Sequence, residues 1–508
     1  MALFKTRSAA IFGIDAHLIE IEVDLYESGS ARDFVLVGMP DLAVRESRER
    51  IKSALIHSGF RYPGKAVTIN LAPANVRKEG AGFDLPLAIG ILGAMGTVGG
   101  AGRHLMIGEL SLDGAIRPVR GALSVAVCAR REGVPSLVLP QENAAEAAVV
   151  DGIQVFGVRS LAEVVALINQ PEQFQPAVAP APAPGNSIPD FADVRGQASA
   201  KRALEVAAAG AHNVLMIGPP GSGKTMLAKR FAGILPPLTF DEAIETTRIH
   251  SVAGVLPPGA GLLTERPFRS PHHTVSEAGL VGGGVGTARP GEISLAHNGV
   301  LFLDEMPEFP RSVLELLRQP LEDRLVTIAR SNMTLSFPAN FILVGALNPC
   351  PCGFYGDPTR ECRCTGAIIQ RYMSKLSGPL LDRIDLHIEV PAVPYKELRS
   401  SERSAGGQPA GSAQMRERAA QARALQRARG FSNAQIPPGR LRTMCALDEA
   451  GERTLETAVR RMGLSARGHD RILKVARTIA DLSGAEGISA KHLAEAVQYR
   501  TLDREYGM

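Results

Sequence analysis

A run of small and basic residues between an apolar segment and a helical pattern could bind a phosphate group. The run follows the pattern G-x-x-x-x-G-K-[ST] and consists of Gly218, Pro219, Pro220, Gly221, Ser222, Gly223, Lys224 and Thr225. Residues 214–217 predict a buried parallel strand before it, and Leu227 and Phe231 fit one helix face after it. Glycines there let backbone N–H groups surround a phosphate, and the helix N-terminus adds positive charge. A chance glycine-rich loop would lack this setting, so the sequence predicts an ATP site.

Two side chains of this loop and two carboxylates further along the chain could supply the rest of the chemistry. Lys224 provides a point charge for the β- and γ-phosphates, and the Thr225 hydroxyl can bind Mg²⁺. The apolar run 300–303 ends in Asp304 and Glu305. Beside the phosphates, Asp304 can hold Mg²⁺ through water, and Glu305 can accept a proton from an attacking water. A merely solvated acidic pair is the alternative, which its position after a phosphate loop disfavours.

Length and charge bound the wider organisation. At 508 residues, the chain is too long for one hydrophobic core and predicts roughly three domains. The net charge of +4 gives no overall field for nucleic acid, so any basic surface must be local. Aromatic residues make up 5% and Trp is absent, which disfavours recognition by stacking on an aromatic platform.

Nothing in the sequence predicts export or a membrane span. The first residues lack the apolar centre of a secretory signal, and the apolar run 85–95 is too short to cross a bilayer. Without such a signal, the six cysteines are expected as reduced thiols or metal ligands rather than disulfides. We therefore expect a cytoplasmic protein with no membrane partner.

Residues 1–170 alternate β-branched runs with helical patterns, which predicts a mixed α/β domain. A Pro/Ala-rich segment, 171–189, then predicts an extended spacer between two folding units. The clearest elements expected in the first domain are strands at 19–25, 34–37, 66–71 and 154–158 and helices at 41–58 and 123–131.

Two stretches of this first domain, residues 78–84 and 108–143, resemble the proteolytic domain of Lon and the related domain of RadA-type recombination ATPases. The resemblance implies a Lon S5-type mixed α/β fold. The Lon reaction needs a serine nucleophile and a lysine base. This sequence has Gly82 where the family pattern puts the serine and Leu123 where it puts the lysine. We therefore expect the fold without peptidase activity.

Residues 190–393 resemble an AAA+ P-loop domain, which implies a doubly wound α/β unit with a parallel sheet. Before the phosphate loop, three residues resemble the adenine-side box of that class: Asp193, Gly196 and Gln197. After the apolar strand 341–347 comes Asn348, where AAA+ proteins carry a polar residue that orients the lytic water. The alternative is that Asn348 only ends its strand before Pro349.

Residues 380–386, LLDRIDL, resemble the AAA+ box that supplies an arginine to the neighbouring subunit's ATP. In that role Arg383 would offset charge that develops on the γ-phosphate. An ion pair with Asp382 or Asp385 in the same chain is the alternative. The resemblance implies a homo-oligomer, most simply a hexameric ring, because each site is then completed by a neighbour.

Residues 394–508 predict a helical lid. Ser465 can cap a helix over 466–482, which stops before Gly484. Arg467 in the first turn resembles the lid arginine that contacts the γ-phosphate in AAA+ proteins. Arg471, one turn later, is the competing candidate.

Three stretches, 266–284, 289–292 and 378–390, resemble the magnesium-chelatase ATPase subunit and, more closely, the ComM/YifB group of chelatase-like proteins. The resemblance covers nearly the full length. It implies that the insert with His272 and His273 lines a ring pore; as neighbours, the two histidines do not share one helix side as ligands would. Segments 325–330 and 334–337 predict a hairpin that could also reach the pore.

Four thiols on one loop after Asn348 could hold Zn²⁺: Cys350, Cys352, Cys362 and Cys364. Four cysteines so close together suit a tetrahedral site, although C-x-C spacing is tighter than usual. Four reduced, partly exposed cysteines are the alternative. Further on, Arg416, Arg423 and Arg427 fall on one face of a helix, either as a solvated surface or as a face that contacts phosphates.

The resemblances imply a hexameric, ATP-driven motor on DNA, a helicase or branch-migration factor in recombination or natural transformation. The alternative is a chelatase-type ATPase that remodels a protein partner, which a Lon-like first domain disfavours. An ATP-dependent protease is the weakest hypothesis because Gly82 and Leu123 replace the dyad.

Overall fold

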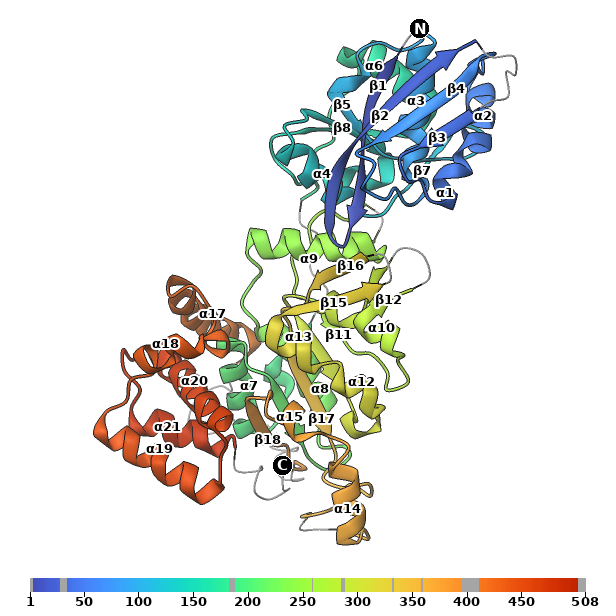
Figure 1. Ribbon diagram of the computed structural model, residues 1–508. Coiled ribbons are helices and arrows are strands. Elements are labelled where there is room, and N and C mark those ends of the chain that lie inside the picture. The colour runs from blue at the N-terminus through green and yellow to red at the C-terminus, as the bar shows by residue number, and fades with distance from the viewer. Residues whose placement is uncertain are drawn as a thin grey trace.

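The computed structural model describes residues 3–27, 34–181, 188–257, 259–284, 288–330, 333–357, 360–393 and 411–500. Three units follow one another in an elongated molecule: an N-terminal unit, a central unit with the phosphate loop, and a group of C-terminal helices (Figure 1). The chain is therefore mixed α/β with a parallel sheet, as predicted, whereas the domain boundaries stay predictions.

The N-terminal unit is built on a seven-stranded mixed sheet in the order β3-β4-β2-β1-β5-β8-β9. Its strands are β1 (Phe4–Phe12), β2 (Asp15–Tyr26), β3 (Phe34–Val37), β4 (Ala66–Ala72), β5 (His104–Met106), β8 (Ser136–Pro140) and β9 (Gln154–Val158). The sequence did not predict β1. Two of its fully buried residues are Thr6 and Ser8, so it lacks the apolar alternation that indicates a half-buried strand.

Helices cover this sheet. The segment expected as one helix over 41–58 forms two, α1 (Leu42–Arg45) and α2 (Ser47–His57). Helix α3 (Asp84–Ala94) is buried over almost its whole length. It can lie against the sheet because Gly90 and Gly93 leave room there: a Cβ on Gly93 would lie 2.2 Å from the ring of Phe4. The remaining longer helices are α4 (Ala122–Arg131) and α6 (Leu161–Asn169).

The central unit contains a five-stranded, fully parallel sheet in the order β11-β14-β17-β10-β18. The strands are β11 (Phe268–Arg269), β14 (Val300–Leu303), β17 (Ile342–Leu347), β10 (Val214–Ile217) and β18 (Leu386–Glu389). The middle strands are buried and apolar throughout, as expected when helices such as α7 (Ala198–Gly210) and α8 (Lys224–Ile234) cover a parallel sheet.

The C-terminal helices are α17 (Ser412–Ala428), α18 (Pro438–Met444), α19 (Glu449–Met462), α20 (Ala466–Leu482) and α21 (Ala490–Gln498). Their apolar faces share one core cluster with the central sheet. Helix α20 begins as predicted, with Ser465 Oγ accepting a hydrogen bond from the N–H of Gly468 at 3.1 Å.

The basic face expected on α17 is not a uniform surface. The guanidinium of Arg423 donates to the carbonyl oxygens of Ala208 and Ala209, at 2.8 and 3.0 Å, so it caps the last turn of α7. Arg416 and Arg427 are exposed. Two guanidinium nitrogens of Arg423 are therefore used within the chain, and the three arginines do not form one solvated face.

The N-terminal and central units meet at α9 (Phe240–Ala253) and at the hairpin of β15 (Leu325–Arg330) and β16 (Met333–Pro338). Ile14, at the tip of the β1–β2 hairpin, joins a buried cluster with Ile249 and Phe337. Arg248 donates to the carbonyl oxygen of Ile14 at 2.7 Å. The hairpin predicted at 325–337 thus exists, but it packs partly against the N-terminal unit.

The described part of the predicted spacer, residues 171–181, does not stand free. It begins with a short 3₁₀ turn, Pro171–Gln173. The N–H of Ala177 then donates to the carbonyl oxygen of Val155 in β9 at 2.7 Å. Residues 182–187 of the predicted spacer lie outside the described parts of the chain.

Candidate nucleotide site

The phosphate loop and the carboxyl ends of β14 and β17 surround one cavity. The parallel register sets Ile217 beside Leu347 and Leu303 beside Gly345, so the residues that follow each strand meet at one edge of the sheet. The cavity has a volume of about 390 Å³. Its lining consists of Pro220, Gly221, Gly223, Lys224, Thr225, Met226, Asp304, Glu305, Leu347 and Asn348.

The loop is shaped by glycine. Gly221 and Gly223 have φ of 77° and 93°, which residues with a side chain adopt only at a cost. A Cβ on Gly218 would lie 2.1 Å from the carbonyl oxygen of Val390, so the loop can follow β18 closely only with glycine there. Helix α8 starts at Lys224 directly after the loop, which sets its N-terminal N–H groups at the cavity.

Lys224 is buried and folded back on the loop. Its ammonium donates to the carbonyl oxygens of Gly218 and Pro219, at 2.7 and 3.0 Å, and to Asn348 Oδ1 at 3.1 Å. Burial lowers the pKa of Lys224, and the negative charges of Asp304 and Glu305 oppose that shift. A phosphate in the cavity would offer this ammonium a stronger partner than the carbonyls.

The oxygens expected to hold Mg²⁺ are adjacent. Thr225 Oγ1 donates to Asp304 Oδ2 at 2.6 Å, so a hydroxyl and a carboxylate face the same part of the cavity, the donor set that Mg²⁺ prefers. Glu305 is exposed at the rim with φ of 49°, a left-handed conformation that is uncommon for a residue with a side chain. Residues held in this conformation are often found at functional sites, where the surrounding structure maintains the strain.

Asn348 and Gln197 contact the loop from two sides. Asn348 directly follows β17, and its amide oxygen accepts a hydrogen bond from Lys224. Gln197 Nε2 donates to the carbonyl oxygen of Ser222 at 2.5 Å, so this residue of the expected adenine-side box supports the loop. The sequence pattern gave no sign of that contact, or of the apolar wall that Met226 and Leu347 form.

The expected arginines lie at the other edge of the sheet. Arg383 donates to Pro379 O at 2.6 Å and pairs with Glu322, neither of the two partners considered from the sequence. Its neighbour Asp385 bonds through its backbone to Asn213, where β10 begins. Because β10 has four residues at about 3.3 Å each, about 13 Å of strand separates Arg383 from the phosphate loop.

The two lid arginines lie near that same edge. Arg471 pairs with Asp385, which also lies 3.4 Å from the buried His212. Burial alone would raise the pKa of Asp385, but the charge of Arg471 and the contact with His212 outweigh it and lower the pKa. The pKa of Glu322 is lowered first by its hydrogen bond from Arg383 and further by the positive charges of Arg383, Arg467 and Arg471. Arg467 is exposed.

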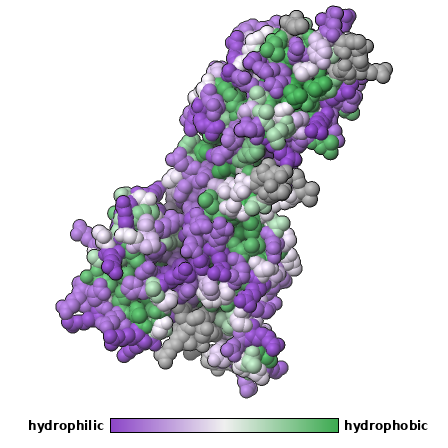
Figure 2. All heavy atoms as spheres, in the orientation of Figure 1, coloured by the Kyte–Doolittle hydropathy of each residue, from purple (hydrophilic) through white to green (hydrophobic). Residues whose placement is uncertain are grey.

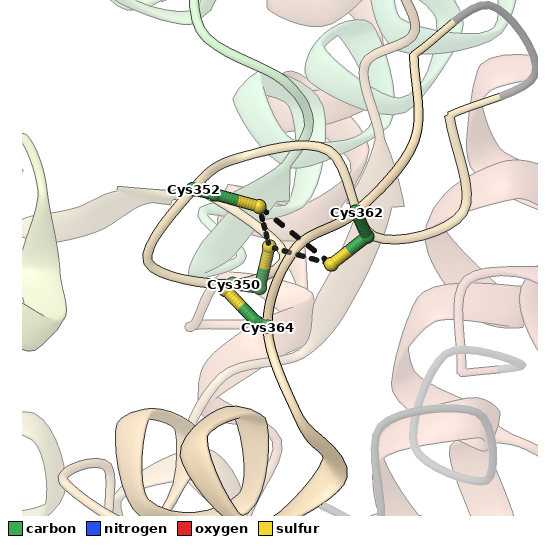
Figure 3. Close-up of side chains that lie close together, drawn as sticks. All are labelled: Cys350, Cys352, Cys362 and Cys364. Carbon is green, nitrogen blue, oxygen red and sulfur yellow. Dashed lines mark hydrogen bonds between the residues drawn. The ribbon is translucent and has the colours of Figure 1, made fainter.

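The four predicted thiols form one cluster (Figure 3). Their sulfur atoms all lie within 4.8 Å of one another, and Cys350 Sγ is 3.3 Å from Cys352 Sγ and 3.7 Å from Cys362 Sγ. Sulfurs around a tetrahedral ion with Zn–S of about 2.3 Å would be about 3.8 Å apart, so the cluster fits such an ion. The backbone N–H groups of Phe354 and Arg363 lower the pKa of Cys352 to about 6.

In the described parts of the chain, the four cysteines make the only cluster in which three or more His, Cys, Asp or Glu side chains could bind one metal ion. His272 and His273 stack on each other with ring centroids 4.0 Å apart. Within that same portion of the chain, no helix is long and apolar enough to cross a membrane. On the face seen in Figure 2, hydrophilic and hydrophobic side chains are interspersed.

A parallel sheet of this strand order, with a phosphate loop, polar strand ends and a helical lid, is the architecture of the AAA+ class. Family models described as "Magnesium chelatase, subunit ChlI", "Subunit ChlI of Mg-chelatase" and "Magnesium chelatase, subunit ChlI C-terminal" match residues 190–398, 21–143 and 409–500. The match to residues 21–143 lies within the N-terminal unit, so this unit also resembles part of a chelatase-type protein.

Full-length relatives narrow the family. The competence protein ComM of Haemophilus influenzae is 44% identical over 99% of this chain and 98% of its own. YifB of Salmonella typhimurium is 42% identical over 99% of this chain and 98% of its own. Lon protease 2 of Bacillus subtilis is 27% identical over 26% of this chain and 24% of its own. The chain therefore belongs to the ComM/YifB family of magnesium chelatase-like AAA+ proteins.

Proposed function

We propose that this protein is an ATP-hydrolysing ring motor, most simply a hexamer, that acts on DNA. One observation carries the proposal: the phosphate cavity and Arg383 lie at opposite edges of the same sheet. A chain cannot bring its own Arg383 to its own cavity without rebuilding the sheet. A second copy could bring it there, which favours a ring of copies.

In this proposal, water attacks the γ-phosphate of ATP, the bond from the γ-phosphorus to the β–γ bridging oxygen breaks, and ADP and phosphate leave. Lys224 and the loop N–H groups bind the phosphates, and Glu305 takes the proton from the water. Thr225 and Asp304 would hold Mg²⁺, which would offset phosphate charge. Asn348 orients that water. Arg383 enters from the neighbour, and the exposed Arg467, whose charge acts on the same Glu322, contacts the neighbour's γ-phosphate beside it.

A DNA substrate is supported by the family. ComM of Haemophilus influenzae is called a competence protein, and competence is the uptake of DNA. We propose a helicase or branch-migration role in recombination or natural transformation. The alternative is an ATPase that remodels a protein partner. The Lon-like resemblance of the first domain counts against it, but the match of residues 21–143 to a chelatase-type family model counts in its favour.

The test of hydrolysis is Glu305→Gln. The variant should bind ATP and assemble, while turnover falls by about 100-fold or more because the water loses its base. Glu308→Gln is the matched control, since Glu308 lies in the adjacent 3₁₀ turn and pairs with Lys375 at 3.7 Å, away from the expected Mg²⁺ ligands. Unchanged hydrolysis in Glu305→Gln would refute the assigned base.

The test of the substrate is ATP turnover with and without single-stranded and branched DNA. A motor on DNA should turn over faster with one of them, and the mass of the complex with ATP should correspond to a ring. Turnover that ignores every DNA form would favour the remodelling alternative.

We also propose that Cys350, Cys352, Cys362 and Cys364 hold one Zn²⁺, because four sulfurs already lie at nearly tetrahedral separations. Elemental analysis of the purified protein should find one zinc per chain. Absence of stoichiometric metal would remove this assignment.

A further inference from the structure

The loop that carries the four cysteines presses on the phosphate loop. Gly353 has φ of 86°, and a Cβ built on it would lie 2.4 Å from Pro220 Cδ. The backbone of Gly353 therefore packs directly against the Pro220 ring, which lines the nucleotide cavity. The N–H of Gly353 donates to the carbonyl oxygen of Cys350 at 2.9 Å, so the contact is tied to the cluster.

A second connection runs through β17. Cys350 is fully buried and follows Asn348 by two residues. Asn348 Oδ1 in turn accepts a hydrogen bond from Lys224. The cluster is thus connected along the chain both to Asn348, which contacts Lys224, and to Gly353, which contacts Pro220.

No regular secondary structure fixes the shape of the described parts of this segment. Between the end of β17 and the start of α14 (Gly366–Met373), the described residues 348–357 and 360–365 form no helix or strand. Gly353 itself has no side chain to anchor it. The sulfur cluster brings together the first part of the segment, with Cys350 and Cys352, and the second part, with Cys362 and Cys364 (Figure 3).

We propose that a metal ion held by the four cysteines braces the phosphate loop: it keeps Gly353 against Pro220 and Asn348 against Lys224, so that the nucleotide site is correctly formed only when the metal is bound. The brace rests on the proposed ATP and zinc sites. Gly353 is a positioning residue, since it does not line the nucleotide cavity and acts through Pro220, which does.

The first experiment removes the metal. Cys364→Ser in the full chain should lose zinc, and the Kd for a fluorescent ATP analogue should rise about 10- to 100-fold, as for a binding group displaced by about 1 Å. Cys445→Ser is the matched control, because Cys445 is a buried thiol outside the cluster. It should keep both zinc and nucleotide affinity.

The second experiment breaks the contact while leaving the ligands in place. Gly353→Ala should keep one zinc per chain, yet raise the KM for ATP by a similar factor, since the new methyl group must displace Pro220. Gly356→Ala is its control: Gly356 also has positive φ, at 79°, but a Cβ there meets nothing within 4 Å. A merely structural role for Gly353 would lower the unfolding midpoint in both variants alike and leave KM unchanged.

Two results would overturn the brace: a zinc-free Cys364→Ser protein with wild-type nucleotide affinity, or a zinc-loaded Gly353→Ala protein with wild-type KM. Should Cys364→Ser fail to fold, the Gly353→Ala result decides alone. A zinc-loaded wild type that binds no ATP would instead refute the proposed function, and a metal-free wild type that hydrolyses ATP would refute the zinc site and the brace with it.

Discussion

His104 begins β5 with its ring buried, only 4% exposed, and with Nδ1 2.7 Å from Ser136 Oγ of β8. Burial and, to a smaller extent, the charge of Arg103 together lower the pKa of His104 to about 4. In the unfolded chain a histidine takes up its proton near pH 6.5. Between these values acid favours the unfolded chain, so His104 costs stability as the pH falls from about 6.5 towards 4.

We expect the N-terminal unit to lose about 1 kcal/mol at pH 5.5 relative to pH 7.5 through this residue. Hydrogen exchange of β5 and β8, corrected for intrinsic rates, measures the opening free energy. His104→Gln can keep a hydrogen bond to Ser136 but cannot titrate. Its opening free energy should therefore fall less between pH 7.5 and pH 5.5 than that of the wild type. An identical loss in both proteins would assign the effect to other groups.

Single residues also show where local patterns stop. The pattern LLDRIDL predicts that Arg383 acts on a neighbouring subunit's ATP, yet its partner in this structure, Glu322, stands 61 residues earlier in the chain. Helical spacing places Arg423 on the same face as Arg416 and Arg427, but its guanidinium donates to a carbonyl oxygen in the last turn of α7. In both cases the contact is made by an element that the local pattern does not include.

At the scale of elements, the tip of the β1–β2 hairpin joins the N-terminal unit to the central one. Gly13 has φ of 59°, and a Cβ there would lie 3.1 Å from the carbonyl oxygen of Ser336. The adjacent Ile14 fills the cluster between α9 and β16. A displacement of the β15–β16 hairpin would therefore also displace the tip of the β1–β2 hairpin in the N-terminal unit.

Ile14→Ala should weaken this joint by about 2 kcal/mol or more, because it leaves a cavity in a buried cluster. The expected result is faster proteolysis between residues 171 and 189 and a lower unfolding midpoint. Ile56→Ala is the control, since Ile56 is 52% exposed and should change neither. Equal proteolysis of both variants would show that the joint does not depend on the hairpin tip.

At the scale of the whole molecule, the ring proposal predicts that two inactive chains can complement each other. The Arg383→Ala chain keeps an intact nucleotide cavity but lacks the arginine for its neighbour. The Glu305→Gln chain keeps Arg383 but lacks the base. In a ring assembled at random from equal amounts of the two variants, about a quarter of the interfaces combine Glu305 of one chain with Arg383 of the next. ATP turnover of the mixture should therefore exceed that of either variant alone.

Glu322→Gln is the control, because it removes the charge that holds Arg383 in its own chain and should leave hydrolysis intact. If both inactive variants assemble with each other and turnover stays at the level of each alone, Arg383 does not act on a neighbour's ATP.

The sequence by itself determined the local pieces: a four-residue apolar strand before the phosphate loop, another before Asp304, and a capped helix after Ser465. Such features depend on neighbours within a few residues, and short-range sterics and burial are enough to set them. It also supplied the family resemblance and the four thiols. It did not show β1, whose buried hydroxyls hide its pattern.

Only the tertiary structure decided which of these pieces meet. Parallel pairing brought the ends of β10, β14 and β17 to one cavity and left Arg383 at the far edge. Chain folding also brought Gly353 against Pro220, 133 positions apart in sequence. The physical reason is that such contacts depend on sheet order and on close packing between distant segments, which no local spacing encodes.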